Sequence, residues 1–112
     1  MYEPSKHLAT FNVAGFQYWD GARVLGELKA GKRLKLVPEP DNPHDPSAIA
    51  LYYHGAKLGY VPAKMNEPLA TFLHFGHRKA VTATVLQVNK KADPWEQVRV
   101  ALSVVDARKK HK

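Results

Sequence analysis

The clearest pattern in the chain is a regular alternation of apolar and polar side chains over short segments. In residues 97–105, Val98, Val100, Leu102 and Val104 recur at every second position. Successive side chains of a β-strand point to opposite faces, so this period predicts strands with one buried face. The other segments that we predict as strands are residues 8–14, 33–37, 48–53, 57–61 and 79–88.

One segment, residues 67–75, shows a helical period instead. Its apolar side chains recur at i, i+3 and i+4 and would cover a sheet or a barrel end: Leu69, Phe72 and Leu73. Asn66 is a suitable N-cap, and Gly76 is a suitable residue to end the helix. A shorter helix is predicted over residues 23–29.

These elements and the length of 112 residues predict a single small domain. Several short strands with one helix favour a mostly β fold, a small OB-like or SH3-like modified β-barrel of about six strands. An open two-layer α+β sheet is the alternative. We expect the domain to cover residues 1–106 and the basic residues 107–112 to form a disordered tail.

The charge balance points to an anionic partner. Seventeen Lys and Arg against ten Asp and Glu give a formal net charge of +7. Such an excess is typical of proteins that bind nucleic acid or a membrane surface. The longest uninterrupted apolar stretches are only a few residues, and the N-terminus has no apolar signal segment. We therefore expect a cytoplasmic protein with no membrane partner.

Several residue groups resemble parts of catalytic or metal sites, but each lacks a necessary component. The chain has no cysteine, which excludes a disulfide framework, a thiolate zinc site and a cysteine nucleophile. Residues 26–33 nearly match a phosphate-binding loop, yet Arg33 stands where the magnesium-binding hydroxyl belongs and a strand follows. His74 and His77 have no third ligand, and His44-Asp45 has no nucleophile. We therefore predict a non-catalytic protein with no metal or cofactor.

The aromatic residues suggest a binding surface. Tyr18, Trp19, Tyr60 and Trp95 fall in loops or at strand ends. In a basic chain, exposed rings at such positions are typical of surfaces on which nucleic-acid bases stack. Lysines such as Lys64 could then contact phosphates. The alternative is that the rings pack the ends of the barrel.

Residues 38–46 form a proline-rich loop that could present polar groups at a fixed geometry. Four prolines restrict its backbone, and Asn42, His44 and Asp45 lie among them. A carboxylate repels phosphate but accepts a hydrogen bond from a hydroxyl, such as a sugar terminus. The alternative is that Asp45 only bonds the backbone near Ser47, as in an Asx-turn.

Three stretches of the sequence resemble the HIRAN domain, in its stand-alone bacterial form. They are residues 11–19 (FNVAGFQYW), 36–49 (LVPEPDNPHDPSAI) and 58–62 (LGYVP), and the likeness extends over about residues 8–105. The resemblance implies an OB-like β-barrel. In eukaryotic relatives it also implies binding to the 3′-hydroxyl end of single-stranded DNA during the remodelling of stalled forks.

The resemblance also implies roles for individual residues. Tyr18 would stack on the terminal base, with His44 on its other side. Asp45 would accept a hydrogen bond from the 3′-hydroxyl. Tyr60 would line the same pocket, and Trp95 would stack on the neighbouring base.

Three positions depart from the family pattern. Gln17 stands where relatives have a phosphate-binding arginine, and His44 replaces an aromatic residue. Ala63 replaces a lysine, although Lys64 follows it. The predicted nucleic-acid-binding residues are Gln17, Tyr18, Trp19, Asn42, His44, Asp45, Tyr60, Lys64 and Trp95.

The sequence thus predicts a single-stranded DNA-binding module that recognises 3′ ends in DNA repair or fork processing. A separate helicase or nuclease would be a further partner. The alternative is a protein–protein interaction module for such a DNA-processing enzyme, with the exposed aromatics as its contact surface.

Overall fold

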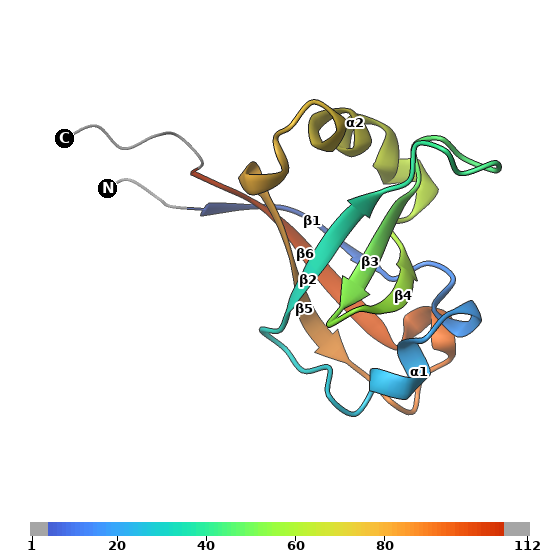
Figure 1. The fold of residues 1–112 in the computed structure, drawn as a ribbon. Coiled ribbons are helices and arrows are strands. Elements are labelled where there is room, and N and C mark those ends of the chain that lie inside the picture. The colour runs from blue at the N-terminus through green and yellow to red at the C-terminus, as the bar shows by residue number, and fades with distance from the viewer. Residues whose placement is uncertain (1–4, 107–112) are drawn as a thin grey trace.

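The computed structural model describes residues 5–106, in which six strands form a single sheet of order β1-β6-β5-β2-β3-β4 (Figure 1). Every pair of neighbouring strands is antiparallel. The strands are β1 (Ser5–Asn12), β2 (Arg33–Pro38), β3 (Ile49–Tyr53), β4 (Ala56–Tyr60), β5 (Val81–Val88) and β6 (Val98–Val105). The predicted tail, residues 107–112, lies outside the described residues.

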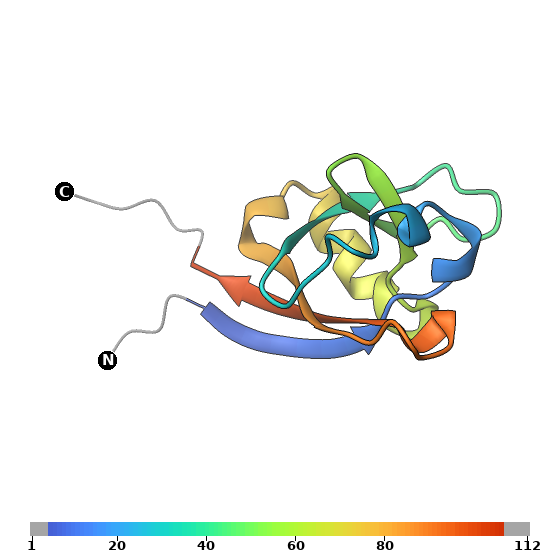
Figure 2. The same cartoon turned by 90° about the horizontal axis from the view of Figure 1, so that it is seen from below.

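The alternating pattern predicts the buried faces correctly. In β2, Leu34 and Leu36 are buried while Arg33 and Lys35 are exposed. Alternate residues of β5 and β6 are likewise buried, because one face of each strand lines the core. The core therefore lies inside the curve of the sheet, which Figure 2 shows from below.

The two edge strands of the sheet approach each other at one end. Ala14, just after β1, forms an isolated antiparallel bridge with Tyr60 of β4, with both N–H···O distances at 2.8 Å. The sheet is thus curled like a small barrel and joined at this point, but it is not closed along its length. The predicted mostly β, barrel-like class is confirmed in this form.

Gly59 permits this close approach. Its φ is +147°, and a Cβ placed on it would lie 2.4 Å from the carbonyl oxygen of Ala14. A side chain at this position would therefore collide with the backbone of Ala14, and the positive φ would strain the backbone of the substituted residue itself.

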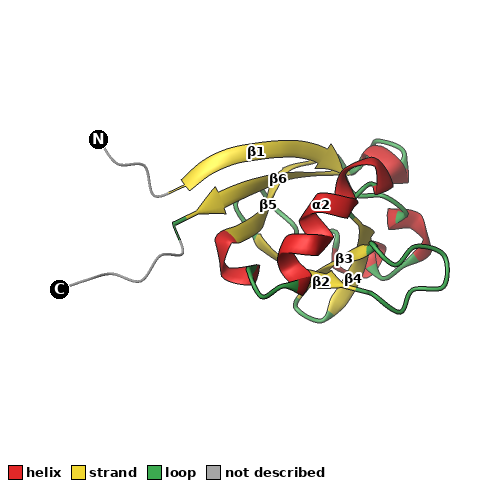
Figure 3. Cartoon of the chain, turned by 90° about the horizontal axis from the view of Figure 1, so that it is seen from above, coloured by secondary structure: helices red, strands yellow, loops and turns green. Residues whose placement is uncertain are grey.

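One main helix, α2 (Ala63–His74), lies across the end of the curled sheet between its two halves (Figure 3). It begins earlier than predicted: Pro62, not Asn66, is the N-cap residue. The reason is that Val61 still bonds the sheet, through its N–H to Ile49 O at 3.0 Å, and the chain turns into the helix directly after it. Gly76 ends the helix as predicted, with φ +93° and the bond from His77 N–H to Phe72 O.

The buried face of α2 also differs from the prediction. Leu69 and Leu73 face the core, but Phe72 is 57% exposed. Because the helix begins before Asn66, this asparagine lies within it and shares the buried face with the two leucines. Phe72 therefore falls beside that face, on the solvent side.

Four short helical turns complete the structure: η1 (Phe16–Tyr18), α1 (Gly21–Val24), η2 (Arg78–Ala80) and η3 (Pro94–Glu96). The helix predicted over residues 23–29 is wrong in its extent, since only α1 is helical and turns follow it. The segment that nearly matched a phosphate loop leads into β2, as predicted, so no helix N-terminus is available there for phosphate. Within residues 5–106, no helix is long and apolar enough to cross a membrane.

Candidate nucleic-acid interface

A cavity of about 480 Å³ opens where three segments meet at the joined end of the sheet. The segments are the turn after β1, the proline-rich loop between β2 and β3, and the junction of β4 with α2. Ligand pockets commonly have volumes of about 300–1,000 Å³. The side chains and backbone that line the cavity belong to Ala14, Gly15, Tyr18, Trp19, Asn42, His44, Asp45, Ala48, Tyr60, Val61, Ala63 and Asn66.

The cavity has an aromatic wall made of three rings. Tyr18, on η1, is 77% exposed, and Trp19 beside it is 43% exposed. Tyr60 is half-buried, and its ring meets that of Trp19 edge-on, with centroids 5.9 Å apart. One interpretation of the sequence was that these rings pack the ends of the barrel. The three rings are not all buried in that way, and the Tyr18 ring in particular is exposed to solvent.

Lys57 of β4 contacts two of the three rings in this wall. Its Nζ lies 3.7 Å from the centroid of the Trp19 ring and 4.5 Å from that of Tyr60. It also donates to the Tyr60 hydroxyl at 2.6 Å and forms an ion pair with Glu39 at 2.9 Å. One ammonium group thus contacts both rings, which fixes their relative position.

The charges of this cluster stabilise one another. Partial burial alone would raise the pKa of the Glu39 carboxyl, but hydrogen bonds from Lys57, Asn42 and Tyr60 outweigh it and hold that pKa below its usual value. Burial would likewise lower the pKa of Lys57, yet its bonds to Tyr60 and Glu39 raise it above its usual value. Both groups are therefore charged at neutral pH.

Asn42 organises the proline-rich loop. Its side-chain oxygen accepts hydrogen bonds from the backbone N–H groups of His44 at 2.8 Å and Asp45 at 3.1 Å. Its amide nitrogen donates to Glu39 Oε1 at 3.1 Å. The loop that carries His44 and Asp45 is thereby connected to the cluster behind the aromatic wall.

Asp45 is held from two sides and still lines the cavity. Its Oδ1 accepts from the backbone N–H of Ser47 at 2.9 Å, which is the Asx-turn considered above. Its Oδ2 accepts from Nδ2 of Asn66 at 2.8 Å. A carboxylate offers about four lone-pair sites, so these two bonds leave capacity for a further donor.

Three residues of this arrangement were missed by sequence reasoning: Glu39, Lys57 and Asn66. Asn66 was assigned to a helix cap, but it is only 4% exposed and orients Asp45. Glu39 and Lys57 lie 18 positions apart, so no local pattern joins them. The antiparallel pairing of β2, β3 and β4 brings them together.

The structure brings together Tyr18, Trp19, Asn42, His44, Asp45 and Tyr60, but not every predicted site residue. Gln17, Lys64 and Trp95 do not line the cavity. Gln17 and Lys64 are exposed next to residues that do. Trp95 lies on η3, which contacts η1, and is 55% exposed.

The electrostatic character of the cavity follows from its lining. Among the described residues that line it, Asp45 is acidic and none is lysine or arginine. His44 is the one histidine among these lining residues. The cavity therefore suits a flat, largely neutral group with a hydroxyl donor better than a cluster of phosphates.

The described residues contain no group of three or more histidine, aspartate or glutamate side chains placed to hold a metal ion. His74 and His77 lie at the end of α2, where each ring meets a phenylalanine edge-on: His74 meets Phe75, and His77 meets Phe72.

A curled β-sheet with an aromatic pocket built from its loops places the chain among small β-barrel binding modules. The family model of the HIRAN domain matches residues 7–105, and the chain therefore belongs to the HIRAN domain family. HIRAN domains are nucleic-acid-binding modules. The resemblance inferred from the sequence is thus confirmed.

Solved structures agree with this assignment. The crystal structure of a protein from Lactobacillus plantarum aligns with a TM-score of 0.76 and 27% sequence identity, over 91% of this chain and 96% of that chain. The crystal structure of the HIRAN domain of human HLTF aligns with a TM-score of 0.65 and 16% identity, over 90% of this chain and 78% of that chain. The second likeness concerns the fold alone. No curated protein sequence matches the chain.

Proposed function

We propose that the cavity binds the terminal nucleotide at the 3′-hydroxyl end of single-stranded DNA. The observation that carries this proposal is the position of Asp45, whose carboxylate lines the same cavity as the exposed ring of Tyr18. A flat apolar surface beside a hydrogen-bond acceptor suits a base and the hydroxyl of its sugar.

The base of the terminal nucleotide would stack on Tyr18, with His44 on its other side. Tyr18 is available because its exposed ring is held on η1 by a turn, the N–H of Tyr18 bonding Gly15 O at 3.0 Å. Trp19 and Tyr60 would form the rigid side of the pocket. Stacking on an aromatic side chain contributes about 1–3 kcal/mol per base and tolerates any base identity.

Asp45 would identify the end of the strand. A free 3′-hydroxyl can donate a hydrogen bond to the carboxylate, whereas a 3′-phosphate brings negative charge against it. A strand that continues past this sugar has no hydroxyl to donate. Recognition of the end would therefore come from Asp45, and most of the affinity for the base from stacking.

The remaining predicted residues would contact the strand outside the cavity. Trp95, on the turn beside η1, would stack on the next base. Lys64 and Gln17, both exposed next to lining residues, would face the sugar–phosphate backbone. Two or three phosphate contacts close to the pocket would give a shallow log–log salt dependence of about −1.5 to −2.

Such a module would act without catalysis of its own, in DNA repair or fork processing, by placing a separate helicase or nuclease at a strand end. This role rests on the membership of the HIRAN family and on the proposed end recognition.

The proposal is tested by titrating labelled single strands that differ only at the 3′ end. The wild-type chain should bind the 3′-hydroxyl strand more tightly than the 3′-phosphate strand, by about tenfold for a loss of about 1.4 kcal/mol. Asp45→Asn should reduce this preference, because the amide carries no charge. Asp41→Asn, an exposed change in the same loop outside the cavity lining, is the matched control and should retain it. Equal affinity of the wild-type chain for the two ends would remove end recognition.

A further inference from the structure

A second hollow, the basic groove, lies at the other end of α2. Its volume is about 260 Å³, and four basic side chains from two elements line it: Arg33 and Lys35 of β2, and Arg78 and Lys79 of η2. Its floor includes the buried side chains Leu34, Leu36, Leu73 and Val81. No acidic side chain in the described part of the chain lines it.

The charges of the basic groove are available to a ligand. Arg33, Lys35, Arg78 and Lys79 are all exposed, and within residues 5–106 no ion pair engages them. Lys57 provides the contrast, since its charge is committed to Glu39. Free cations around a short groove attract an anion with several charges.

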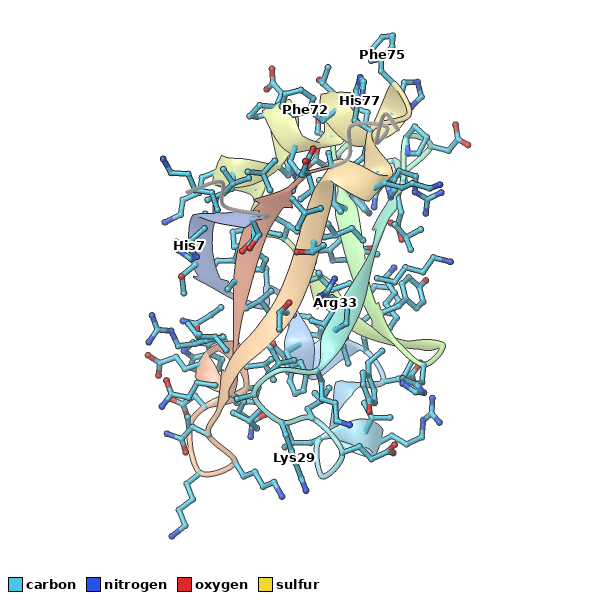
Figure 4. The ribbon with its side chains drawn as sticks, turned by 90° about the vertical axis from the view of Figure 1, so that its left-hand side faces the viewer. His7, Lys29, Arg33, Phe72, Phe75 and His77 are labelled. Carbon is cyan, nitrogen blue, oxygen red and sulfur yellow. The ribbon has the colours of Figure 1, made fainter. Side chains whose placement is uncertain are left out.

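Two exposed rings lie at the C-terminal end of α2, the end of the helix that η2 follows with Arg78 and Lys79. Phe72 is 57% exposed and Phe75 is 73% exposed, both at the C-terminal end of α2. Figure 4 shows Phe72, His77 and Phe75 at this end of the helix, with Arg33 on the face of the sheet below them. Proteins bind single-stranded nucleic acid with aromatic and basic side chains together: the bases stack on the rings, and the phosphates contact the cations.

The helix connects the basic groove to the pocket. Ala63 and Asn66 line the pocket, whereas Leu73 lines the groove. At 1.5 Å per residue, the ten positions from Ala63 to Leu73 cover about 15 Å along the axis. A further hollow of about 200 Å³ lies between the proline-rich loop and the C-terminal half of α2, where Ala70, His74 and Phe75 line it.

We infer that the basic groove binds backbone phosphates of the same DNA strand, on the 5′ side of the nucleotide held in the pocket. This inference rests on the proposed function, and it locates the phosphate contacts that the lining of the pocket lacks. The strand runs from the pocket along α2, past Phe75 and Phe72, to Arg78 and Lys79. At about 3.4 Å per stacked nucleotide, 15 Å corresponds to four or five nucleotides.

The test compares strands of 3 and 12 nucleotides, each with a free 3′-hydroxyl. The 3-nucleotide strand reaches only the pocket, whereas the 12-nucleotide strand also reaches the groove. The double variant Arg78→Glu/Lys79→Glu should weaken binding of the long strand by at least tenfold. It should also lower the magnitude of the salt slope by about 0.7 for each phosphate that the protein no longer neutralises. Binding of the short strand should change no more than in the control.

The matched control is Lys29→Glu/Lys32→Glu, which makes the same change of charge at exposed positions outside the groove. If both double variants weaken the long strand equally, only the overall charge matters and the inference is overturned. It is also overturned if the groove variant loses binding of a poly-glutamate peptide of 12 residues but keeps full affinity for the long strand, since the groove then accepts an acidic protein segment.

Failure of the proposed function gives a different result. In that case the wild-type chain binds the short strand equally well with a 3′-hydroxyl and with a 3′-phosphate. This result does not depend on how the groove variant binds the long strand. A preference for long strands that is specifically abolished in Arg78→Glu/Lys79→Glu supports the groove independently of that outcome.

Discussion

The pocket and the basic groove lie at opposite ends of α2 and are built in opposite ways. In the pocket, four of the polar side chains in the lining are already bonded within the protein: Asp45 to Asn66, Asn42 to Glu39, and Tyr60 to Glu39 and Lys57. In the basic groove, Arg78 and Lys79 are exposed and engage no ion pair among residues 5–106.

This difference separates two kinds of binding. Groups fixed before binding lose little conformational entropy when a ligand arrives, and they reject ligands that do not match their geometry. Exposed surface cations neutralise the phosphates of a strand whatever its base sequence, and added salt weakens this kind of binding strongly. We therefore expect the pocket to determine which end is bound, and the groove to determine how much strand length and salt matter.

The largest effect should come from Gly59, where the pocket depends on a backbone contact. In Gly59→Ala, the new Cβ would lie 2.4 Å from Ala14 O at a φ of +147°, so the bridge between Ala14 and Tyr60 must separate. We expect a loss of about 2–6 kcal/mol in the free energy of unfolding, from the strain and the collision together. Chemical denaturation measures it.

Gly26→Ala is the control for this substitution, since a Cβ there would meet nothing within 4 Å. It should change the free energy of unfolding by less than about 0.5 kcal/mol. Equal stability of the two variants would show that the sheet edges are not held together at Gly59.

The next largest effect should come from Tyr18, which tests the pocket without disturbing the fold. Tyr18→Ala should weaken binding of a 3′-hydroxyl strand by about 1–3 kcal/mol, or roughly 5- to 150-fold, because one stacking surface is removed. The free energy of unfolding should hardly change, since the ring is 77% exposed. Tyr18→Phe keeps the ring and should bind as the wild-type chain does; a loss equal to that of the alanine variant would assign the effect to the hydroxyl instead.

Local patterns in the sequence predicted most of the elements. The period of two in residues 97–105 and in β2 depends only on neighbouring positions, and both strands form with the expected faces buried. The end of α2 at Gly76 is as expected too, because this signal also depends only on the local sequence. The start of α2 was wrong because it depends on a distant partner, the bond from Val61 to Ile49, which no local pattern reports.

The candidate site was predictable only in part, for a similar physical reason. Tyr18, His44 and Asp45 are recognisable from their types and their segments, and the cavity includes them. Glu39 and Lys57 belong to different segments of the sheet, and their roles arise from strand pairing. Nor could the sequence reveal that Phe72 is exposed, since that follows from which face of α2 packs on the sheet.

The network that supports the pocket predicts a smaller effect, one that depends on pH. The pKa of Glu39 is lowered in the folded chain from a usual value of 4.5. A group with a lowered pKa stabilises the fold above its unfolded pKa, and this contribution is lost as the pH falls through the folded value. The pKa of Lys57 is raised from 10.5, so its contribution is present below that value and is lost in more alkaline solution.

Glu39→Gln should therefore lower the free energy of unfolding by about 1 kcal/mol at pH 7, because Lys57 loses its charged partner. The deficit should shrink as the pH falls below 4.5, the usual pKa of this carboxyl, and vanish once the pH passes the lowered pKa of the folded chain. Chemical denaturation at pH 7 and pH 3 measures both values, and Glu27→Gln, an exposed change on the turn after α1, should show no such convergence. At pH 7 the variant should also weaken binding of a 3-nucleotide 3′-hydroxyl strand by a few fold, since Lys57 no longer holds Trp19 and Tyr60 at a fixed angle. A deficit that stays constant between the two pH values would mean that the charge of Glu39 does not support the pocket, and that packing alone positions the aromatic wall.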